Sequence, residues 1–287
     1  MTRQTKKNPG DTKPNIDLDV VAGFGDEWTR FDQSGLSDLD QKAVFEAYFA
    51  IFPWSMLKPG SEGFDLGCGS GRWAALIAPR VGTLHCIDAS IDALSVAKRN
   101  LEEQRNCQFH HASVDAIPLA DGSADFGFSL GVLHHVPDTA DAIRSCAAKL
   151  RTGAPFLVYL YYSFDNQPGW YRGIWKSTEL IRFLLSRSPS IVRFWASQII
   201  ASVIYYPLAR TAFLLEKLGV NVKAFPLSIY RHREFYVMRT DALDRFGTRL
   251  EQRFSRAQIE VMMKDAGLVE IRFSDKAPYW VAVGIKS

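Results

Sequence analysis

Apolar and polar positions follow one rhythm between residues 61 and 160, where short apolar runs alternate with stretches of helical periodicity. This order is typical of βαβ units, in which helices join parallel strands. It predicts strands at 63–66, 83–87, 107–111, 124–130 and 155–160. Helices are predicted between them near 71–80, 90–105 and 138–150, with Ser90 and Asp138 as N-caps of the last two. Right-handed crossovers then place helices on both faces of the sheet.

The pattern continues on both sides of this region. A helix is predicted from Ser37 up to Pro53, with apolar residues at helical spacing. Near the C-terminus, Ser255 and Gln258 form a capping box, and two further strands follow at 269–274 and 279–285. These two strands are expected to pair as an antiparallel edge hairpin. The fold class is therefore α/β, with a seven-stranded, mostly parallel sheet, an antiparallel C-terminal hairpin and a helical insertion.

Three parts follow along the chain. Residues 1–22 are polar and contain Pro9, Gly10 and Pro14, so we expect a loose N-terminal arm. The core comprises 23–162 and 246–287, and 163–245 is a mostly helical insertion or cap. Within 24–28, Phe24 to Trp28 form either a lid over a ligand or a segment merely docked by the tryptophan.

The insertion is both apolar and locally basic. It has apolar helical segments near 176–186 and 191–218. Between residues 163 and 220 the sequence contains seven basic residues and only three acidic ones. This mixture fits a cap over a lipid-like substrate or peripheral contact of 176–218 with an anionic membrane. A solvated helical cap or a homodimer surface fits equally well. The uncharged stretch 194–209 is shorter than the roughly 20 residues of a spanning helix, so no crossing is expected.

Composition narrows the class of partner and the compartment. The 287 residues carry a formal charge of +3, so nucleic acid is not an expected partner. The four cysteines, Cys68, Cys86, Cys107 and Cys146, have no regular spacing, and the N-terminus lacks an apolar signal core. We expect a reducing, cytoplasmic location.

A glycine loop carries the strongest chemical signal. The sequence Phe-Asp-Leu-Gly-Cys-Gly-Ser-Gly-Arg (64–72) runs from a strand into a helix, where glycines let the backbone approach an anionic ligand. Asp88, at the end of the second strand, suits the two hydroxyls of a ribose. A dinucleotide fingerprint would need glycine or alanine in place of Arg72. The two features together predict a nucleoside cofactor, either NAD or an adenosyl group.

Further motifs favour an adenosyl cofactor over NAD. The chain has Ile-Asp-Ala-Ser at 87–90, Ile-Pro-Leu-Ala-Asp-Gly-Ser-Ala-Asp-Phe at 117–126 and Gly-Val-Leu-His-His-Val-Pro-Asp at 131–138. With the glycine loop, this ordered set resembles the class I S-adenosylmethionine-dependent methyltransferases, particularly the ubiquinone/menaquinone C-methyltransferase-like group. The resemblance covers about residues 61–160, with a weaker echo at 253–285, and implies a Rossmann-like fold and S-adenosylmethionine as cofactor.

The resemblance also implies roles for individual residues. Asp65 would brace the loop and the methionine ammonium, and the loop glycines would lie against the methionine part. Asp88 with Ala89 would hold the ribose, and Leu130 would sit beside the amino acid. Relatives place an acidic side chain five residues before the proline of the Ile-Pro motif, where this chain has Ser113. Either Ser113 or Asp115 would then contact the adenine amino group, with the Val114 N–H on a ring nitrogen. The implied cofactor-binding set is Asp65, Gly67, Gly69, Gly71, Asp88, Ala89, Ser113, Val114, Asp115 and Leu130.

Candidate catalytic residues follow the fourth and fifth strands. His134 or His135 could act as a base, because imidazole titrates near neutral pH, and Tyr161 is a further candidate. Each could instead be a capping or packing residue. No metal site is expected, because His110 and His111 have no partner at metal-ligand spacing. In the segment 230–241, Arg231, Arg233 or Arg239 could hold an anion, or could pair internally with Asp241 and Asp244.

These features predict an enzyme that moves a methyl group from S-adenosylmethionine to a small-molecule acceptor, lipid-like or anionic. Two alternatives stay open: an NAD(P)-dependent oxidoreductase, and a cofactor-binding partner protein without catalytic activity.

Overall fold

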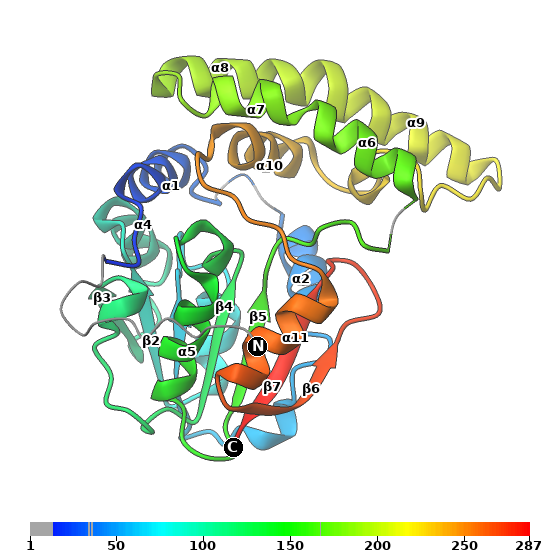
Figure 1. Cartoon of the computed structure of the whole chain (residues 1–287). Helices are drawn as coiled ribbons and strands as arrows, with labels where there is room; N and C mark the ends of the chain where they lie inside the picture. The colour runs from blue at the N-terminus through cyan, green and yellow to red at the C-terminus, as the bar shows by residue number, and fades with distance from the viewer. Residues whose placement is uncertain (1–13, 34, 36, 167) are drawn as a thin grey trace, which may run out of the picture.

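A seven-stranded sheet forms the centre of the molecule (Figure 1). The computed structural model describes residues 14–33, 35, 37–166 and 168–287. The strand order is β3-β2-β1-β4-β5-β7-β6, and all pairs are parallel except those that involve β7. The prediction of a mostly parallel sheet with an antiparallel C-terminal hairpin is confirmed. The strands are β1 (Glu62–Leu66), β2 (Thr83–Asp88), β3 (Cys107–His111), β4 (Phe126–Leu130), β5 (Pro155–Tyr159), β6 (Leu268–Phe273) and β7 (Val281–Lys286).

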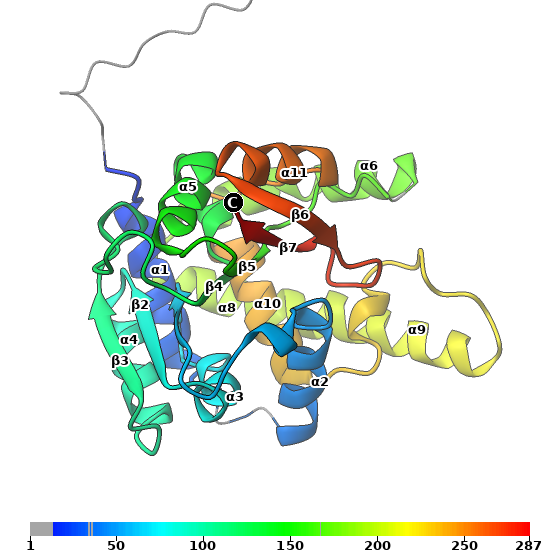
Figure 2. The ribbon, with the colours of Figure 1, turned by 90° about the horizontal axis from the view of Figure 1, so that it is seen from below.

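Helices cover both faces of the sheet and bury two apolar layers. Figure 2 shows α5 (Thr139–Lys149) and α11 (Arg256–Asp265) on one face, where Ile143, Cys146 and Met263 join the core. On the other face lie α2 (Asp38–Tyr48), α3 (Ala74–Ile77) and α4 (Ile91–Asn100). Strands buried on both sides are therefore nearly continuous in apolar residues, as the sequence pattern required.

Two elements differ from the predicted ones. The helix expected at 71–80 is only α3, followed by a 3-10 turn at Ala78–Arg80, because Pro79 has no N–H to continue an α-helix. Helix α1 (Leu18–Arg30) begins inside the expected loose arm, since the Asp17 side chain accepts from the N–H of Asp19 and Val20. Residues 1–13 of that arm lie outside the described residues.

Helix α1 owes its position to a close contact with α4. A Cβ added to Gly25 would lie 2.7 Å from the Ser90 hydroxyl, so the two helices approach at a glycine. This contact brings α1 over the carboxyl ends of the strands, where Figure 1 shows it beside the cap.

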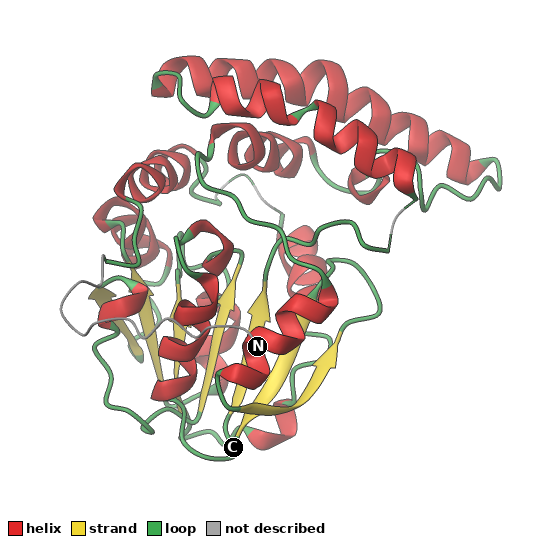
Figure 3. Ribbon diagram, viewed as in Figure 1, coloured by secondary structure: helices red, strands yellow, loops and turns green. Residues whose placement is uncertain are grey.

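The insertion is a helical layer above the carboxyl ends of the strands (Figure 3). It contains α6 (Gly169–Ser177), α7 (Glu179–Leu185), α8 (Ser190–Ile200), a π-helical turn (Ala201–Tyr205), α9 (Tyr206–Lys217) and α10 (Phe235–Gly247). The run from Ser190 to Lys217 is one continuous helix of 28 residues, longer than the predicted apolar stretch, and its length and composition would suffice to cross a membrane. A small separate core of Ala201, Tyr205, Ala209, Met238, Ala242 and Phe246 joins this helix to α10.

Candidate functional site

A cavity of about 1180 Å³ lies between the carboxyl ends of the strands and the helical cap. The loops after β1, β2, β4 and β5 form its floor, and α1, α10 and the 223–231 segment form its walls and roof. In doubly wound sheets ligands bind at this edge, because the strand order reverses there. Here the reversal falls between β1 and β4.

The glycine loop adopts a backbone that side chains would obstruct. Gly67 has φ +77° and lines the cavity, and a Cβ there would lie 2.3 Å from a methyl of Val132. Gly69 lies under the Trp28 ring and Gly71 against Leu101, with φ +54° and +80°. Of the three predicted glycines, Gly67 lines the cavity and the other two shape the turn beneath it.

Asp65 is a buried carboxylate without a partner. Its exposure is 0%, and neither carboxylate oxygen has a hydrogen bond in the described part of the chain. Burial, with repulsion from Asp88, raises the pKa of this group well above its usual range. A buried unpaired carboxylate is costly, so its position beneath the glycine loop fits a cationic group such as the methionine ammonium.

Asp88 is held in place by the backbone around it. Its carboxylate accepts the Gly69 N–H at 2.9 Å and the Ser90 N–H at 2.8 Å. Burial raises the pKa of Asp88, although both hydrogen bonds oppose that shift. Asp88 and Ala89 both line the cavity, so lone pairs of the carboxylate can still meet ribose hydroxyls.

The predicted adenine contacts lie together, but Asp115 has other partners. Ser113 and Val114 line the cavity, as does Leu130. Asp115 accepts the Asn15 N–H at 3.0 Å and the Ser113 hydroxyl, and the latter bond holds its pKa below the usual range. Asn15 itself lines the cavity, a contact that its place in a polar N-terminal segment did not reveal.

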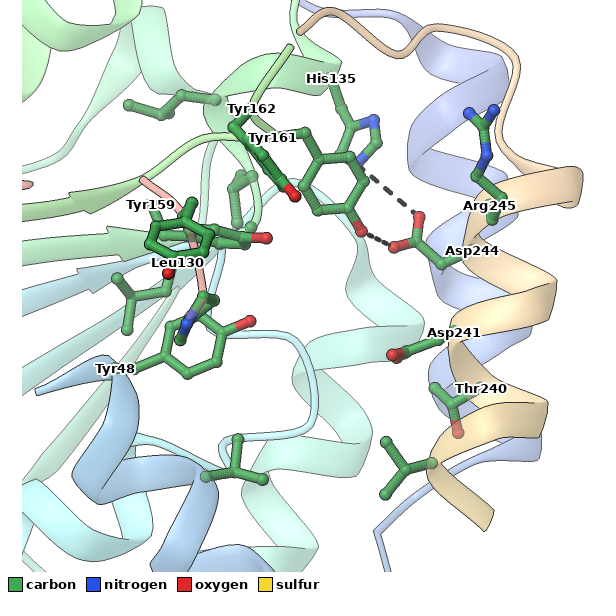
Figure 4. Close-up of a pocket in the computed structure, with 18 of the residues that line it drawn as sticks. Tyr48, Leu130, His135, Tyr159, Tyr161, Tyr162, Thr240, Asp241, Asp244 and Arg245 are labelled. Carbon is green, nitrogen blue, oxygen red and sulfur yellow. Dashed lines mark hydrogen bonds and ion pairs between the residues drawn. The ribbon is translucent and has the colours of Figure 1, made fainter. Parts of the chain in front are cut away.

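Two of the three predicted catalytic residues, His135 and Tyr161, lie beside one carboxylate that the sequence did not single out as catalytic, that of Asp244. His134 is buried and stacks on Tyr161 with ring centroids 3.9 Å apart, and burial holds its pKa well below the usual range. His135 lines the cavity, its Nδ1 donates to the Leu250 carbonyl at 2.7 Å, and its Nε2 lies 3.8 Å from Asp244. The Tyr161 hydroxyl also donates to Asp244 (Figure 4).

Three carboxylates meet on this side of the cavity. Asp241 and Asp244 project from α10 toward the sheet (Figure 4), and Glu27 comes from α1. Burial raises the pKa of all three groups, to about 6 for Asp241, and repulsion from the two aspartates raises that of Glu27 further. Glu27 is 4% exposed, and none of its described neighbours forms an ion pair with it. The three carboxylates come together only because α1 and α10 both fold over the carboxyl edge of the sheet. Their spacing in the sequence could not reveal this.

Aromatic side chains enclose these carboxylates. Tyr48 and Tyr159 meet edge to face with centroids 5.0 Å apart, and Tyr230 donates a hydrogen bond to Asp241. Burial raises the pKa of Tyr48 to about 12, so its phenol stays protonated at neutral pH. The Arg72 guanidinium lies over the rings of Trp28 and Trp73 and opposes the raised pKa of Glu27 and Asp241.

The arginines of 230–241 have partners inside the protein other than those predicted, two of them in the cap and one on α2. Arg231 binds Glu216 at 2.8 Å, and Arg233 lies 3.5 Å from Asp40. Arg239 donates to the Gln198 side chain at 2.5 Å. None of the three forms an ion pair with Asp241 or Asp244 in the described residues, and both of these carboxyl groups line the cavity.

Comparisons with known proteins agree with this geometry. A family model described as a methyltransferase domain matches residues 64–158. A ubiquinone biosynthesis O-methyltransferase of Albidiferax ferrireducens is 36% identical over 111 residues, which cover 38% of this chain and 42% of the relative. Phosphoethanolamine N-methyltransferase 2 of Caenorhabditis elegans is 31% identical over 107 residues, which cover 36% of this chain and 24% of the relative. The chain thus spans less than half the length of these curated relatives.

A solved structure extends the similarity to the whole fold. A protein from Bordetella parapertussis, described as a possible exported protein, superposes with a TM-score of 0.52 at 14% identity, over 91% of this chain and 79% of that one. The likeness concerns the fold alone. Together, the domain match over residues 64–158, the relatives and the sheet order support the predicted resemblance to the class I S-adenosylmethionine-dependent methyltransferases.

Proposed function

We propose that the protein transfers a methyl group from S-adenosylmethionine to a small-molecule acceptor. The observation that carries this proposal is the unpartnered, fully buried carboxylate of Asp65, which lies beneath the glycine loop. Asp65 does not itself line the cavity, whereas Gly67 of that loop and Asp88 do. The match to a methyltransferase domain favours this function over a nicotinamide-dependent oxidoreductase.

The cofactor would lie along the loops after β1, β2, β3 and β4. Asp65 and Gly67 would hold its amino-acid end, Asp88 the ribose, and Ser113 with Val114 the adenine. When bound, the cofactor supplies a methyl group on a positively charged sulfonium. The chain itself has to align the acceptor with this methyl group and exclude water.

The acceptor would occupy the chamber of Glu27, Asp241 and Asp244. An acceptor that carries a proton on its nucleophilic atom must lose it as the new bond to carbon forms, and a carboxylate of raised pKa can take that proton. Asp244 is the best placed, because it lines the cavity and is oriented by Tyr161 and Thr248. Through Asp244, His135 and Tyr161 act as positioning residues.

A lipid-like acceptor fits this chamber better than one with an anion next to its nucleophile. Three carboxylates would repel a negative charge beside them, and the cavity is also lined by the apolar side chains of Phe164, Trp175, Phe225 and Ile229. Such an acceptor would reach the site from a membrane surface, and residues 176–218 of the cap are the part of the chain that we propose to contact one.

Methyl transfer tests the function directly. Purified protein with S-adenosylmethionine labelled in the methyl group is expected to label a component of a cellular lipid or metabolite extract. Asp244→Asn is expected to lower kcat about 100-fold or more, because it removes the proton acceptor. Asp265→Asn, an exposed change at the end of α11, should leave the rate unchanged. Binding of the cofactor without labelling of any extract would support the non-catalytic alternative instead.

The raised pKa of Asp241 predicts an unusual dependence of stability on pH. The folded protein binds a proton at Asp241 up to about pH 6, whereas the unfolded chain releases it near pH 4. Ionisation of Asp241 therefore destabilises the folded state: the penalty is absent below about pH 4 and reaches its full size as pH rises through about 6. Asp241→Asn is expected to raise Tm by a few degrees at pH 7.5 and by nothing at pH 4, as measured by calorimetry. An equal shift of Tm at both values would contradict this assignment.

We also propose that the protein is located in the cytoplasm. Cys68, Cys86, Cys107 and Cys146 are all free thiols, and three of them are buried. A reducing cytoplasm would keep them so.

A further inference from the structure

The long helix of the cap has its apolar side on the outside. Ser197, Gln198, Ala201, Tyr205, Ala209 and Ala212 are buried and face the protein. Ile191, Trp195, Ile199 and Val203 recur every four residues on the opposite side, and Leu214 and Leu218 follow near the end of the helix. All six are 56–79% exposed. A helix on the surface of a soluble protein normally shows the reverse arrangement. The outward side of this helix therefore needs an apolar environment.

A neighbouring helix widens this surface. Leu180, Ile181, Phe183 and Leu184 of α7 are 49–68% exposed, and α7 runs beside α8 along the outer edge of the cap (Figure 1). The combined surface, here called the cap face, is formed by Leu180, Ile181, Phe183, Leu184, Ile191, Val192, Trp195, Ile199, Val203, Ile204, Tyr206, Leu214 and Leu218. Single exposed apolar residues need no explanation, but a contiguous set of this size marks an interaction surface.

The charges around the cap face have one sign. In the described part of 168–218, the exposed charged residues are Arg172, Lys176, Arg187 and Lys217. The two carboxylates of α7 and α9, Glu179 and Glu216, are instead engaged by basic residues of the cap.

Two of the cations also lie against apolar groups. The Arg187 guanidinium lies 3.7 Å from the Phe183 ring centre, and the Lys217 ammonium lies 4.5 Å from that of Phe213. Long basic side chains with this arrangement extend from an apolar surface toward phosphate groups.

We propose that the cap face docks on the surface of an anionic lipid bilayer, with the helix of residues 190–217 lying in the plane of the interface. Apolar side chains would enter the boundary between headgroups and acyl chains, and the four exposed cations would meet lipid phosphates. This inference rests on the membrane contact proposed above for residues 176–218 and specifies its surface and lipid charge, while vesicle binding is measured independently of methyl transfer.

Two other occupants fit the surface less well. A symmetric pair of chains would bring the cations of two cap faces together without an exposed acidic partner, which costs free energy. A membrane-spanning arrangement would require the helix to leave α10, to which it is held by the shared core and by the bond from Arg239 to Gln198.

The inner side of the cap connects the membrane with the proposed site. Tyr171 and Trp175 of α6 line the cavity, and so do Phe225 and Ile229 beyond the end of α9. A lipid-like molecule that leaves the bilayer at the cap would therefore meet aromatic and apolar groups on its way to the carboxylate chamber.

Co-sedimentation with vesicles tests the proposal on the full chain. At low salt the protein is expected to sediment with vesicles of phosphatidylcholine and phosphatidylglycerol, less with phosphatidylcholine alone, and less at high salt. Trp195→Asp combined with Ile199→Asp is expected to lower the partition coefficient at least tenfold. Lys176→Ala combined with Arg187→Ala should remove the preference for anionic vesicles.

Controls separate this result from misfolding and from the proposed function. Val261→Asp changes an exposed apolar residue on α11, and vesicle binding should persist. Affinity of each variant for S-adenosylhomocysteine, compared with that of the unchanged protein, reports whether the fold is intact.

Three results would overturn the proposal. The first is that the protein without substitutions stays in the supernatant with both kinds of vesicle; a dimer that dissociates in the Trp195→Asp and Ile199→Asp variant would then identify a second copy as the occupant. The second is equal loss of vesicle binding in Val261→Asp, and the third is retention in the membrane after alkaline carbonate extraction.

Discussion

Asp88→Ala is expected to weaken the binding of S-adenosylhomocysteine by about 100-fold or more, measured by titration calorimetry. The carboxylate lines the cavity, and hydrogen bonds to a charged group each contribute about 1.5–3 kcal/mol. Loss of two ribose contacts therefore costs at least about 3 kcal/mol of binding free energy. The substitution also removes the acceptor for the Gly69 and Ser90 N–H groups, which loosens the glycine loop itself.

A matched control comes from the opposite edge of the sheet. Asp121 is 75% exposed in its side chain and pairs with Lys149. Asp121→Ala removes the same charge without touching the cavity, so binding should be unchanged. If both variants bound the ligand as tightly as the unchanged protein, the placement of the ribose at Asp88 would be wrong.

Asp65→Asn is expected to change stability and cofactor binding in opposite directions. Without ligand, the carboxylate is buried and has no partner among the described residues, so its neutral isostere should raise Tm by roughly 2–6 °C at pH 7.5. The raised pKa gives the sign: the folded protein favours the protonated form, so the charged form lowers stability as pH rises. The same change should weaken binding of S-adenosylhomocysteine about 100-fold, since a neutral amide pairs poorly with an ammonium.

The two readouts distinguish this role from a purely structural one. Thermal scans with and without S-adenosylhomocysteine measure both in a single experiment, because a ligand that binds only the folded state raises Tm. A structural role alone would lower Tm in both conditions. If Asp65→Asn retained the full ligand-induced rise in Tm, the carboxylate would not contact the amino-acid end of the ligand.

Most of the core was predictable because local patterns and burial agree there. The five parallel strands lie within two residues of the predicted ranges, since strands covered on both faces must be continuous in apolar residues. Gly67 and Asp88 were predictable as a pair for a related reason. The carboxyl ends of neighbouring parallel strands meet at one edge, so residues that follow β1 and β2 in sequence also meet in space.

The acceptor side was not predictable from spacing. Glu27 lies on α1 and Asp244 on α10, more than 200 residues apart, and neither belongs to a motif. Their proximity follows from the contact of α1 with α4 at Gly25 and from the return of α10 over the cavity. The assignments of individual cofactor contacts and of a catalytic base stay predictions for the experiments above.

The amino-acid sequence by itself determined the order of strands and helices along the core, the glycine loop and the resemblance to a methyltransferase domain. Each of these depends on neighbours within one βαβ unit, where short-range periodicity and burial act together. Only the tertiary structure decided which carboxylates share a chamber and which side of the 190–217 helix faces out. Composition gives an apolar helix no direction, and its orientation was set by small and polar side chains that pack on α10.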